Sequence, residues 1–120
     1  MPRVLALGLD PVFADYTQMP GLNADLVRAF IDAQLARLSN AGYDVVSCLV
    51  DLGETAEAET ARQLAQRTFD CVLIGAGLRA PPQLLLFEKL LNLIRVQAPS
   101  AKICFNTSPA DSVEAVQRWV

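Results

Sequence analysis

Two aspartates stand where predicted strands end, and carboxylates at that position are candidate ligands for a divalent cation. Asp10 follows the apolar run Arg3–Leu9, and Asp51 follows the run Val45–Val50. If the two strands are neighbours in a parallel sheet, both carboxylates lie at one edge, where they can hold Mg²⁺ together with water. The same side chains are also good caps for the loop or helix that follows each strand. The residues leave both interpretations open.

A glycine turn closes the most apolar segment of the chain, Cys71–Ile74. Residues 75–80 read Gly-Ala-Gly-Leu-Arg-Ala, which matches the dinucleotide-binding pattern G-x-G-x-x-A between a strand and a helix. However, Pro81 and Pro82 remove two N–H donors that a pyrophosphate would use, and Asn106 occupies the place where a ribose-binding acid is expected. Nucleotide binding therefore competes with a simpler hypothesis, a tight turn that requires glycine.

Polar residues near this turn extend the candidate site. Arg79 begins the next helical segment, where its guanidinium would clamp a carboxylate or a phosphate; the alternative is an exposed loop arginine. Ser108 also fits the N-cap position of a final helix. The expected ligand site, at the mouth between the first and third strands, consists of Asp10, Gly75, Gly77, Arg79, Asn106, Thr107 and Ser108.

Histidine is absent from the chain. No Ser-His or Cys-His pair and no imidazole-based zinc site can therefore form within one chain. The cysteines, Cys48, Cys71 and Cys104, each fall inside a predicted strand, and we interpret them as reduced core thiols, with a disulfide or a metal role as the alternative. The sequence points to no catalytic residue and no cofactor, and it leaves open whether the protein is an enzyme.

Four strand–helix units position these residues. The expected strands are Arg3–Leu9, Val45–Val50, Cys71–Ile74 and Lys102–Phe105; the expected helices run from the N-cap Asn23 to Asn40, from Thr55 to Thr68, from Pro82 to Ala98, and onward from Ser108. This alternation predicts one α/β domain over residues 1–120, with a parallel sheet covered on both faces. Strand order 2-1-3-4 places the uniformly apolar third strand in the centre, whereas order 3-2-1-4 places it at an edge. We expect 2-1-3-4, a three-layer α/β/α, flavodoxin-like arrangement.

The first connection, Pro11–Leu22, is longer than usual between a strand and a helix, and long loops in compact domains are often functional. Arg28 and Asp32 in the following helix are spaced for an ion pair on its exposed side. The opposite side carries the apolar stripe Leu26, Val27, Phe30, Ile31, Leu35 and Leu38.

The helix Pro82–Ala98 has more apolar surface than a sheet alone should cover. Nine of the fourteen residues from Gln83 to Val96 are large and apolar, and they span about 180° of the circumference where about 100° suffices. Either neighbouring helices of the same chain or a second subunit must bury the surplus. We expect a homodimer with Leu86, Leu90 and Leu93 in its interface.

Composition limits the partners and the compartment. The 120 residues include ten basic and thirteen acidic ones, scattered along the chain, for a formal net charge of -3. A nucleic-acid groove or an anionic-membrane patch needs clustered Lys and Arg, so we expect neither partner. The start, Met-Pro-Arg, leads into a strand without a secretory apolar region or a run of spanning length, which favours the cytoplasm.

The arrangement resembles the receiver domains of bacterial response regulators over four β-α units of that five-unit family. Asp10 stands where the family has a metal-binding acid, and Thr107 or Ser108 stands where it has a hydroxyl residue. Gly75 replaces the phosphoacceptor aspartate, and the fifth strand with its lysine is missing, so phosphorylation is not implied. The segments 69–77 and 103–109 also resemble small bacterial proteins without an assigned activity.

Two functions follow as hypotheses. The preferred one is a non-catalytic, regulatory domain that acts through protein association, with the helix Pro82–Ala98 as the partner surface. The alternative is a small-molecule binder or enzyme that uses the mouth between Asp10 and Gly77, with Mg²⁺ and an anionic ligand such as a nucleotide held near Arg79.

Overall fold

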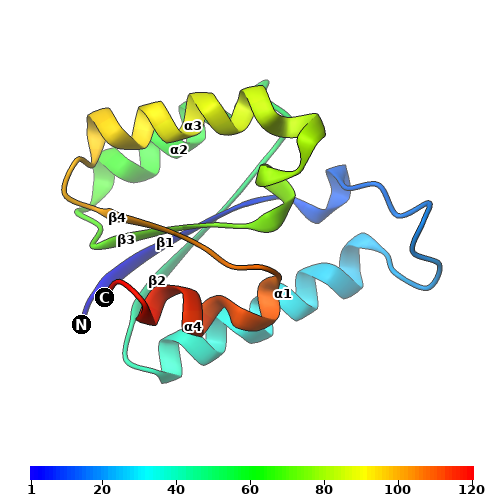
Figure 1. Cartoon of the computed structure of the whole chain (residues 1–120), viewed down its shortest axis with the longest axis horizontal. Coiled ribbons are helices and arrows are strands. Elements are labelled where there is room, and N and C mark those ends of the chain that lie inside the picture. Colours follow the sequence, from blue (N-terminus) through cyan, green and yellow to red (C-terminus); the bar gives the residue numbers. More distant parts are fainter.

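The computed structural model describes residues 1–120 and contains a four-stranded parallel sheet between two pairs of helices (Figure 1). The strands are β1 (Arg3–Leu9), β2 (Asp44–Val50), β3 (Cys71–Ile74) and β4 (Lys102–Phe105), and the helices are α1 (Ala24–Asn40), α2 (Ala56–Gln66), α3 (Leu84–Gln97) and α4 (Ser112–Gln117). The strand order is β2-β1-β3-β4. The predicted order and the three-layer, flavodoxin-like class are confirmed, with element ends displaced by one to a few residues.

The two central strands owe their place to uninterrupted apolar sequence. All four residues of β3 are buried, as are Val4 to Leu7 of β1. In the register, Leu5 lies opposite Val46 of β2 and opposite Val72 of β3. A strand with a neighbour on each side and helices on both faces has no surface left for polar side chains.

Helices cover both faces of the sheet. In Figure 1, α2 and α3 lie on one side of the strands, while α1 and α4 lie on the other. Each layer has its own core. The core under α2 and α3 includes Leu5, Leu7, Val72, Ile74, Leu90 and Ile94; the core under α1 and α4 includes Val4, Leu38, Tyr43, Leu73, Val113 and Val116.

Local signals set several helix ends. The side chain of Asn23 accepts a hydrogen bond from the backbone N–H of Leu26 at 2.9 Å, which caps α1 as predicted. Gly42, just past the end of α1, has a φ of 100°, which favours glycine. Ser108 and Asp111 form the expected capping box before α4, around a short 3₁₀ turn.

The surplus apolar surface of α3 is covered largely by the same chain. Leu90 is completely buried in the core, so its predicted role in a subunit interface is wrong. Leu86 and Leu93 are half-buried and pack against the same core, beside which α2 contacts α3. A second helix on this face provides the cover that the sequence pattern assigned to another subunit. The exposed large apolar residues of α3 are Leu84, Leu85 and Val96.

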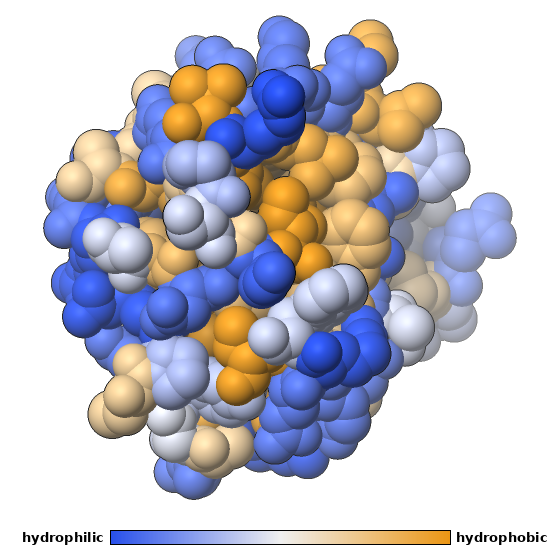
Figure 2. Space-filling view, turned by 60° about the vertical axis from the view of Figure 1, so that its left-hand side comes forward, coloured by the Kyte–Doolittle hydropathy of each residue, from blue (hydrophilic) through white to orange (hydrophobic).

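The surface is mixed in polarity. Figure 2 turns forward the side on which both termini lie in Figure 1, and its apolar residues form separate patches divided by hydrophilic ones. No helix of the chain combines the length and the apolar character needed to cross a membrane.

The two sides of α3 should respond differently to truncation. Leu90→Ala removes a fully buried side chain and should lower the free energy of unfolding by about 2–5 kcal/mol, because it leaves a cavity in the core. Leu85→Ala, on the exposed side, should change it by less than about 0.5 kcal/mol. Urea denaturation of both variants measures the difference. Equal losses would mean that α3 packs through another face.

Candidate functional site

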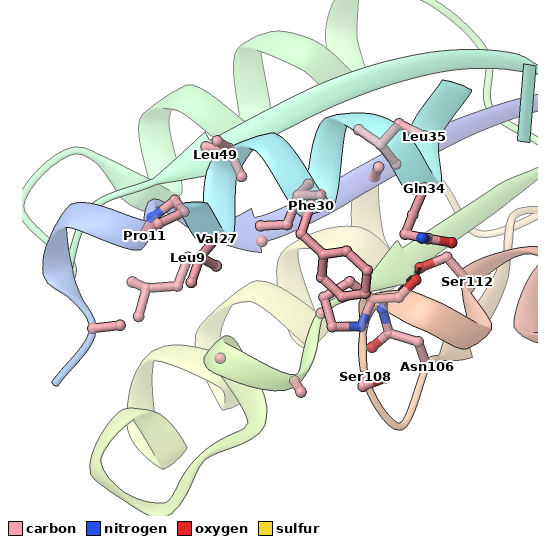
Figure 3. A pocket seen from close by; sticks show the side chains of 18 of the residues that line it. Leu9, Pro11, Val27, Phe30, Gln34, Leu35, Leu49, Asn106, Ser108 and Ser112 are labelled. Carbon is pink, nitrogen blue, oxygen red and sulfur yellow. Dashed lines mark hydrogen bonds between the residues drawn. The ribbon is translucent and has the colours of Figure 1, made fainter. Parts of the chain in front are cut away.

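A cavity of about 650 Å³ lies between α1 and the sheet (Figure 3). It opens at the carboxyl ends of β1 and β3, the two adjacent strands whose connections leave on opposite faces. Open α/β sheets bind their ligands at this switch point. The volume falls within the range of about 300–1,000 Å³ that small-molecule sites occupy.

Much of the floor of the cavity is made of residues with little or no side chain, and Leu49 and Leu73 lie beside them. Gly8 of β1 lies beside Gly75, whose N–H donates to the carbonyl of Leu7 at 2.9 Å. A Cβ added to Gly75 would lie 3.7 Å from the Cα of Gly8, which shows how closely the two glycines adjoin. Two residues before Gly8 in β1, Ala6 pairs with Ser47 of β2. The sheet therefore offers α1 few side chains to pack against.

The roof of the cavity is the amino-terminal half of α1. Leu38, in the last turns, is the only fully buried residue of this helix. Leu26 and Phe30, in the first turns, remain 53% and 44% exposed although their side of the helix faces the sheet. Every residue of the predicted apolar stripe except Leu38 therefore lines the cavity, and Leu35 also packs against the core.

The loop between β1 and α1 forms one wall. Tyr16 donates a 2.6 Å hydrogen bond from its hydroxyl to the carbonyl of Pro11, which holds the loop against the 3₁₀ turn Pro11–Phe13. Met19 and Leu22, both nearly half exposed, line the mouth beside this wall. The unusual length of the loop, noted in the sequence, serves to enclose this end of the cavity.

Polar side chains collect on the other side. Figure 3 shows Gln34, Asn106, Ser108 and Ser112 together there, with Leu9, Pro11 and Val27 across the cavity and the ring of Phe30 between the two groups. Asn106 donates from Nδ2 to the Oγ of Ser112 at 3.1 Å. None of the 26 lining residues carries a charge.

The structure brings together most of the residues expected at the ligand site. Those that line the cavity are Gly75, Gly77, Asn106, Thr107 and Ser108. Asp10, Asp51 and Arg79 do not line it. The residues that sequence reasoning missed are the small floor residues and Gln34, since neither an alanine in a strand nor a glutamine in a helix carries a recognisable signal.

Arg79 serves as a cross-link between segments. Its Nε donates to the carbonyl of Ile74 at 3.2 Å, and its Nη2 donates to both the carbonyl and the side-chain oxygen of Asn106. The guanidinium also lies 4.9 Å from the centre of the Phe105 ring. Partial burial lowers the pKa of Arg79 from its ordinary value. These contacts tie the turn after β3 to the end of β4.

The two aspartates act as caps in the structure. Asp51 accepts hydrogen bonds from the Thr55 hydroxyl and from the backbone N–H groups of Gly53, Thr55 and Ala56. The bond from the Thr55 hydroxyl contributes most to lowering the pKa of Asp51. Asp10 accepts a backbone bond from Val12. No group of three or more His, Cys, Asp or Glu side chains in the chain could hold a metal ion.

Asp10 also forms an ion pair with Arg28. The Nη2 of Arg28 lies 2.5 Å from the Oδ1 of Asp10 and its Nη1 lies 3.7 Å from Asp25, whereas no ion pair joins it to Asp32. The prediction of an Arg28–Asp32 pair is therefore wrong. Spacing along a helix could not reveal the true partner, because that pairing requires the long loop to return α1 to the end of β1.

Neither glycine of the turn has an unusual backbone conformation, and only Gly77 is needed for space. Gly75 has a φ of -71°, and the only positive φ values in the chain belong to Gly21, Gly42 and Gly53. A Cβ on Gly77 would approach the Cβ of Leu9 to 3.2 Å. Gly77 thus allows the turn to pack closely on the end of β1.

The three cysteines are buried free thiols, as the sequence predicts. Cys71 and Cys104, on neighbouring strands, place their sulfur atoms 3.2 Å apart in the core under α1 and α4. Burial raises the pKa of Cys48 to about 11. At neutral pH this thiol is protonated and is a poor nucleophile.

No protein-family model matches the chain, and no curated protein has significant sequence similarity to it.

Asp51→Ala should lower the melting temperature at pH 7, because three backbone N–H groups lose their cap. Since the pKa of Asp51 is lower in the folded state, its stabilisation is present above the unfolded pKa of about 3.9 and disappears as the pH falls through the folded pKa. The gap in melting temperature between wild type and variant should narrow below about pH 4. Calorimetry across pH measures it.

The same experiment with added Mg²⁺ separates the capping role from metal binding. Mg²⁺ should leave both melting temperatures unchanged, because Asp10 and Asp51 are already occupied by Arg28 and by backbone donors. A Mg²⁺-dependent rise in wild type that is lost in Asp51→Ala would contradict the capping interpretation.

Proposed function

We propose that this protein binds a small organic molecule in the cavity between α1 and the sheet. The observation that carries the proposal is the pairing of a glycine floor with an apolar helix that stands above it, at the switch point of the sheet. Interiors of proteins are normally close-packed. A space of this size next to the apolar side chains of Leu26 and Phe30 is typical of a site that binds a ligand.

Burial of apolar surface would supply much of the affinity. Complete burial of a Leu or Phe side chain stabilises by roughly 1.5–3 kcal/mol. Leu26 and Phe30 are about half exposed, so a molecule that covers them would gain on the order of 1 kcal/mol from each. Met19 and Leu22, at the mouth, offer similar surface.

The surroundings favour binding over catalysis and disfavour the anionic ligand that the sequence suggested. Ser108 and Ser112 line the cavity, and no lining residue carries an imidazole, an amine or a carboxylate that could take a proton from their hydroxyls. Arg79, the expected phosphate clamp, is held by carbonyl oxygens and does not line the cavity. A nucleotide would find no cation among the lining residues.

Filling the cavity should abolish binding without unfolding the protein. In Gly8→Leu, the new side chain would occupy the floor, and its Cβ would meet Leu49 at an ordinary 3.5 Å. Ala33→Leu adds the same group to an exposed position of α1 that does not line the cavity. We expect apolar compounds to raise the melting temperature of wild type and of Ala33→Leu but not that of Gly8→Leu, as mass action requires.

A thermal-shift panel of apolar metabolites, nucleotides, phosphorylated metabolites and divalent ions, followed by native mass spectrometry, makes this comparison. Stabilisation by nucleotides alone, or shifts that Gly8→Leu leaves intact, would overturn the proposed site.

Self-association is a second candidate function, favoured by one surface feature. Leu52 and Leu85, exposed by 52% and 71%, border a hollow of about 390 Å³ between the start of α2 and the start of α3, and the exposed Leu84 precedes Leu85 in sequence. A second copy of the chain would cover this patch. Polar residues Glu88, Lys89 and Asn92 separate it from Val96 along α3, so the patch is small.

Leu85→Glu should convert a dimer of about twice the 13.0 kDa chain mass into a monomer, because burying a charged carboxylate in the contact between copies is costly even with Lys89 four residues on in the same hollow. Val96→Glu, at an equally exposed site outside the hollow, should leave the mass unchanged. Light scattering over a range of concentrations gives the masses. A single-chain mass for wild type throughout would remove this candidate.

A further inference from the structure

On the premise of the proposed function, we infer that the ligand is an uncharged, largely apolar molecule that presents a hydrogen-bond acceptor oxygen, such as a ketone or ester carbonyl, to the side of the cavity where Gln34 lies. Three features of the cavity lead to this class: its lack of charge, the amide donor of Gln34 left without a partner, and the separation of its polar and apolar sides.

The lining carries no charged side chain, and the charged side chains near it already have partners. None of the 26 lining residues is charged. Nearby, Arg28 is bound to Asp10, Arg37 lies 3.8 Å from Glu114, and the carboxylate of Asp111 accepts from Thr107. An ionised ligand group would lose its hydration here without gaining a counter-ion, which is costly.

The side-chain amide of Gln34 keeps one donor without a partner in the chain. The side-chain oxygen of Gln34 accepts a 2.8 Å bond from Nη1 of Arg37. That bond orients the amide, because only the oxygen can accept from a guanidinium, and it leaves Nε2 of Gln34 without a partner in the chain. Asn106 and Ser112 are joined to each other, and Ser112 also donates to Pro109. A ligand oxygen that accepts from Nε2 of Gln34 would give this donor the partner that the chain does not supply.

The cavity separates its polar and apolar groups by position. Figure 3 shows Gln34 on the same side as Asn106 and Ser112, while Leu9, Pro11 and Val27 lie across from it. A molecule with its oxygen at one end would place its hydrocarbon against Phe30 and this apolar wall. The volume of about 650 Å³ admits an elongated chain or a small ring system.

The test uses three ten-carbon compounds that differ at one end, 2-decanone, decanoate and decylammonium, as competitors of the neutral fluorescent dye Nile red at pH 7. We expect 2-decanone to displace the dye with a dissociation constant at least tenfold lower than that of either ion. An ion that competes equally well or better, or a dye that none of the three displaces, would overturn the inferred class.

Dye binding by itself reports on the proposed function. Nile red that binds wild type and fails to bind Gly8→Leu supports a ligand cavity even if the order of the competitors overturns the inferred class. Absence of dye binding together with absence of binding by all three compounds, measured directly by calorimetry, would overturn both.

Variants of Gln34 test the orientation of the ligand. Gln34→Leu removes the donor while keeping an apolar lining, and should weaken 2-decanone about threefold to tenfold, the usual value of one hydrogen bond. Gln34→Glu replaces the donor with a carboxylate and should weaken it further. Gln97→Glu, at an exposed position of α3 away from the cavity, controls for the added charge. Unchanged 2-decanone affinity in both Gln34 variants, with Nile red still bound, would overturn the assigned contact.

Discussion

The pairing register between β1 and β3 is the constraint on which the rest of this structure depends. It sets Leu7 opposite Ile74 and so brings Gly8 beside Gly75 on the face below α1. Side chains alternate between the faces of a strand, so a slip of one residue would turn Leu7 or Leu9 toward α1 and close the cavity. The register is well defined because the opposite face of both strands is buried in the core under α2 and α3.

The architecture could be predicted from sequence because its causes are local or periodic. Alternating strands and helices imply a parallel sheet, and the apolar run Cys71–Ile74 identifies a central strand. The placement of Gly75, Asn106 and Ser108 near one site follows from the rule that ligands lie beyond the carboxyl ends of strands. These inferences need only the order of elements along the chain.

The cavity itself could not be predicted, because it depends on how far α1 stands from the sheet. The stripe containing Phe30 has the pattern of ordinary core sequence, and only the structure shows that part of it faces Gly8 and Gly75, which have no side chains to fill the space. Contacts between distant segments also explain the two wrong predictions. Leu90 is buried because α2 lies beside α3, so it is not available to a subunit interface. Arg28 pairs with Asp10 rather than with Asp32 because the loop brings α1 back to the end of β1. Such pairings between distant segments leave no periodic signal.

The extended backbone at Gly8 and Gly75 means that other residues can occupy these two positions of the floor. Gly8 and Gly75 both have conformations that any residue adopts, and a Cβ at either would meet only ordinary contacts. Methyl-sized substitutions there, or at Ala6 and Ser47, would change the volume above the sheet without breaking a strand hydrogen bond. The volume of the cavity is thus set by a few positions on one face of the sheet, so substitutions there would change the space above the strands while the scaffold stays the same.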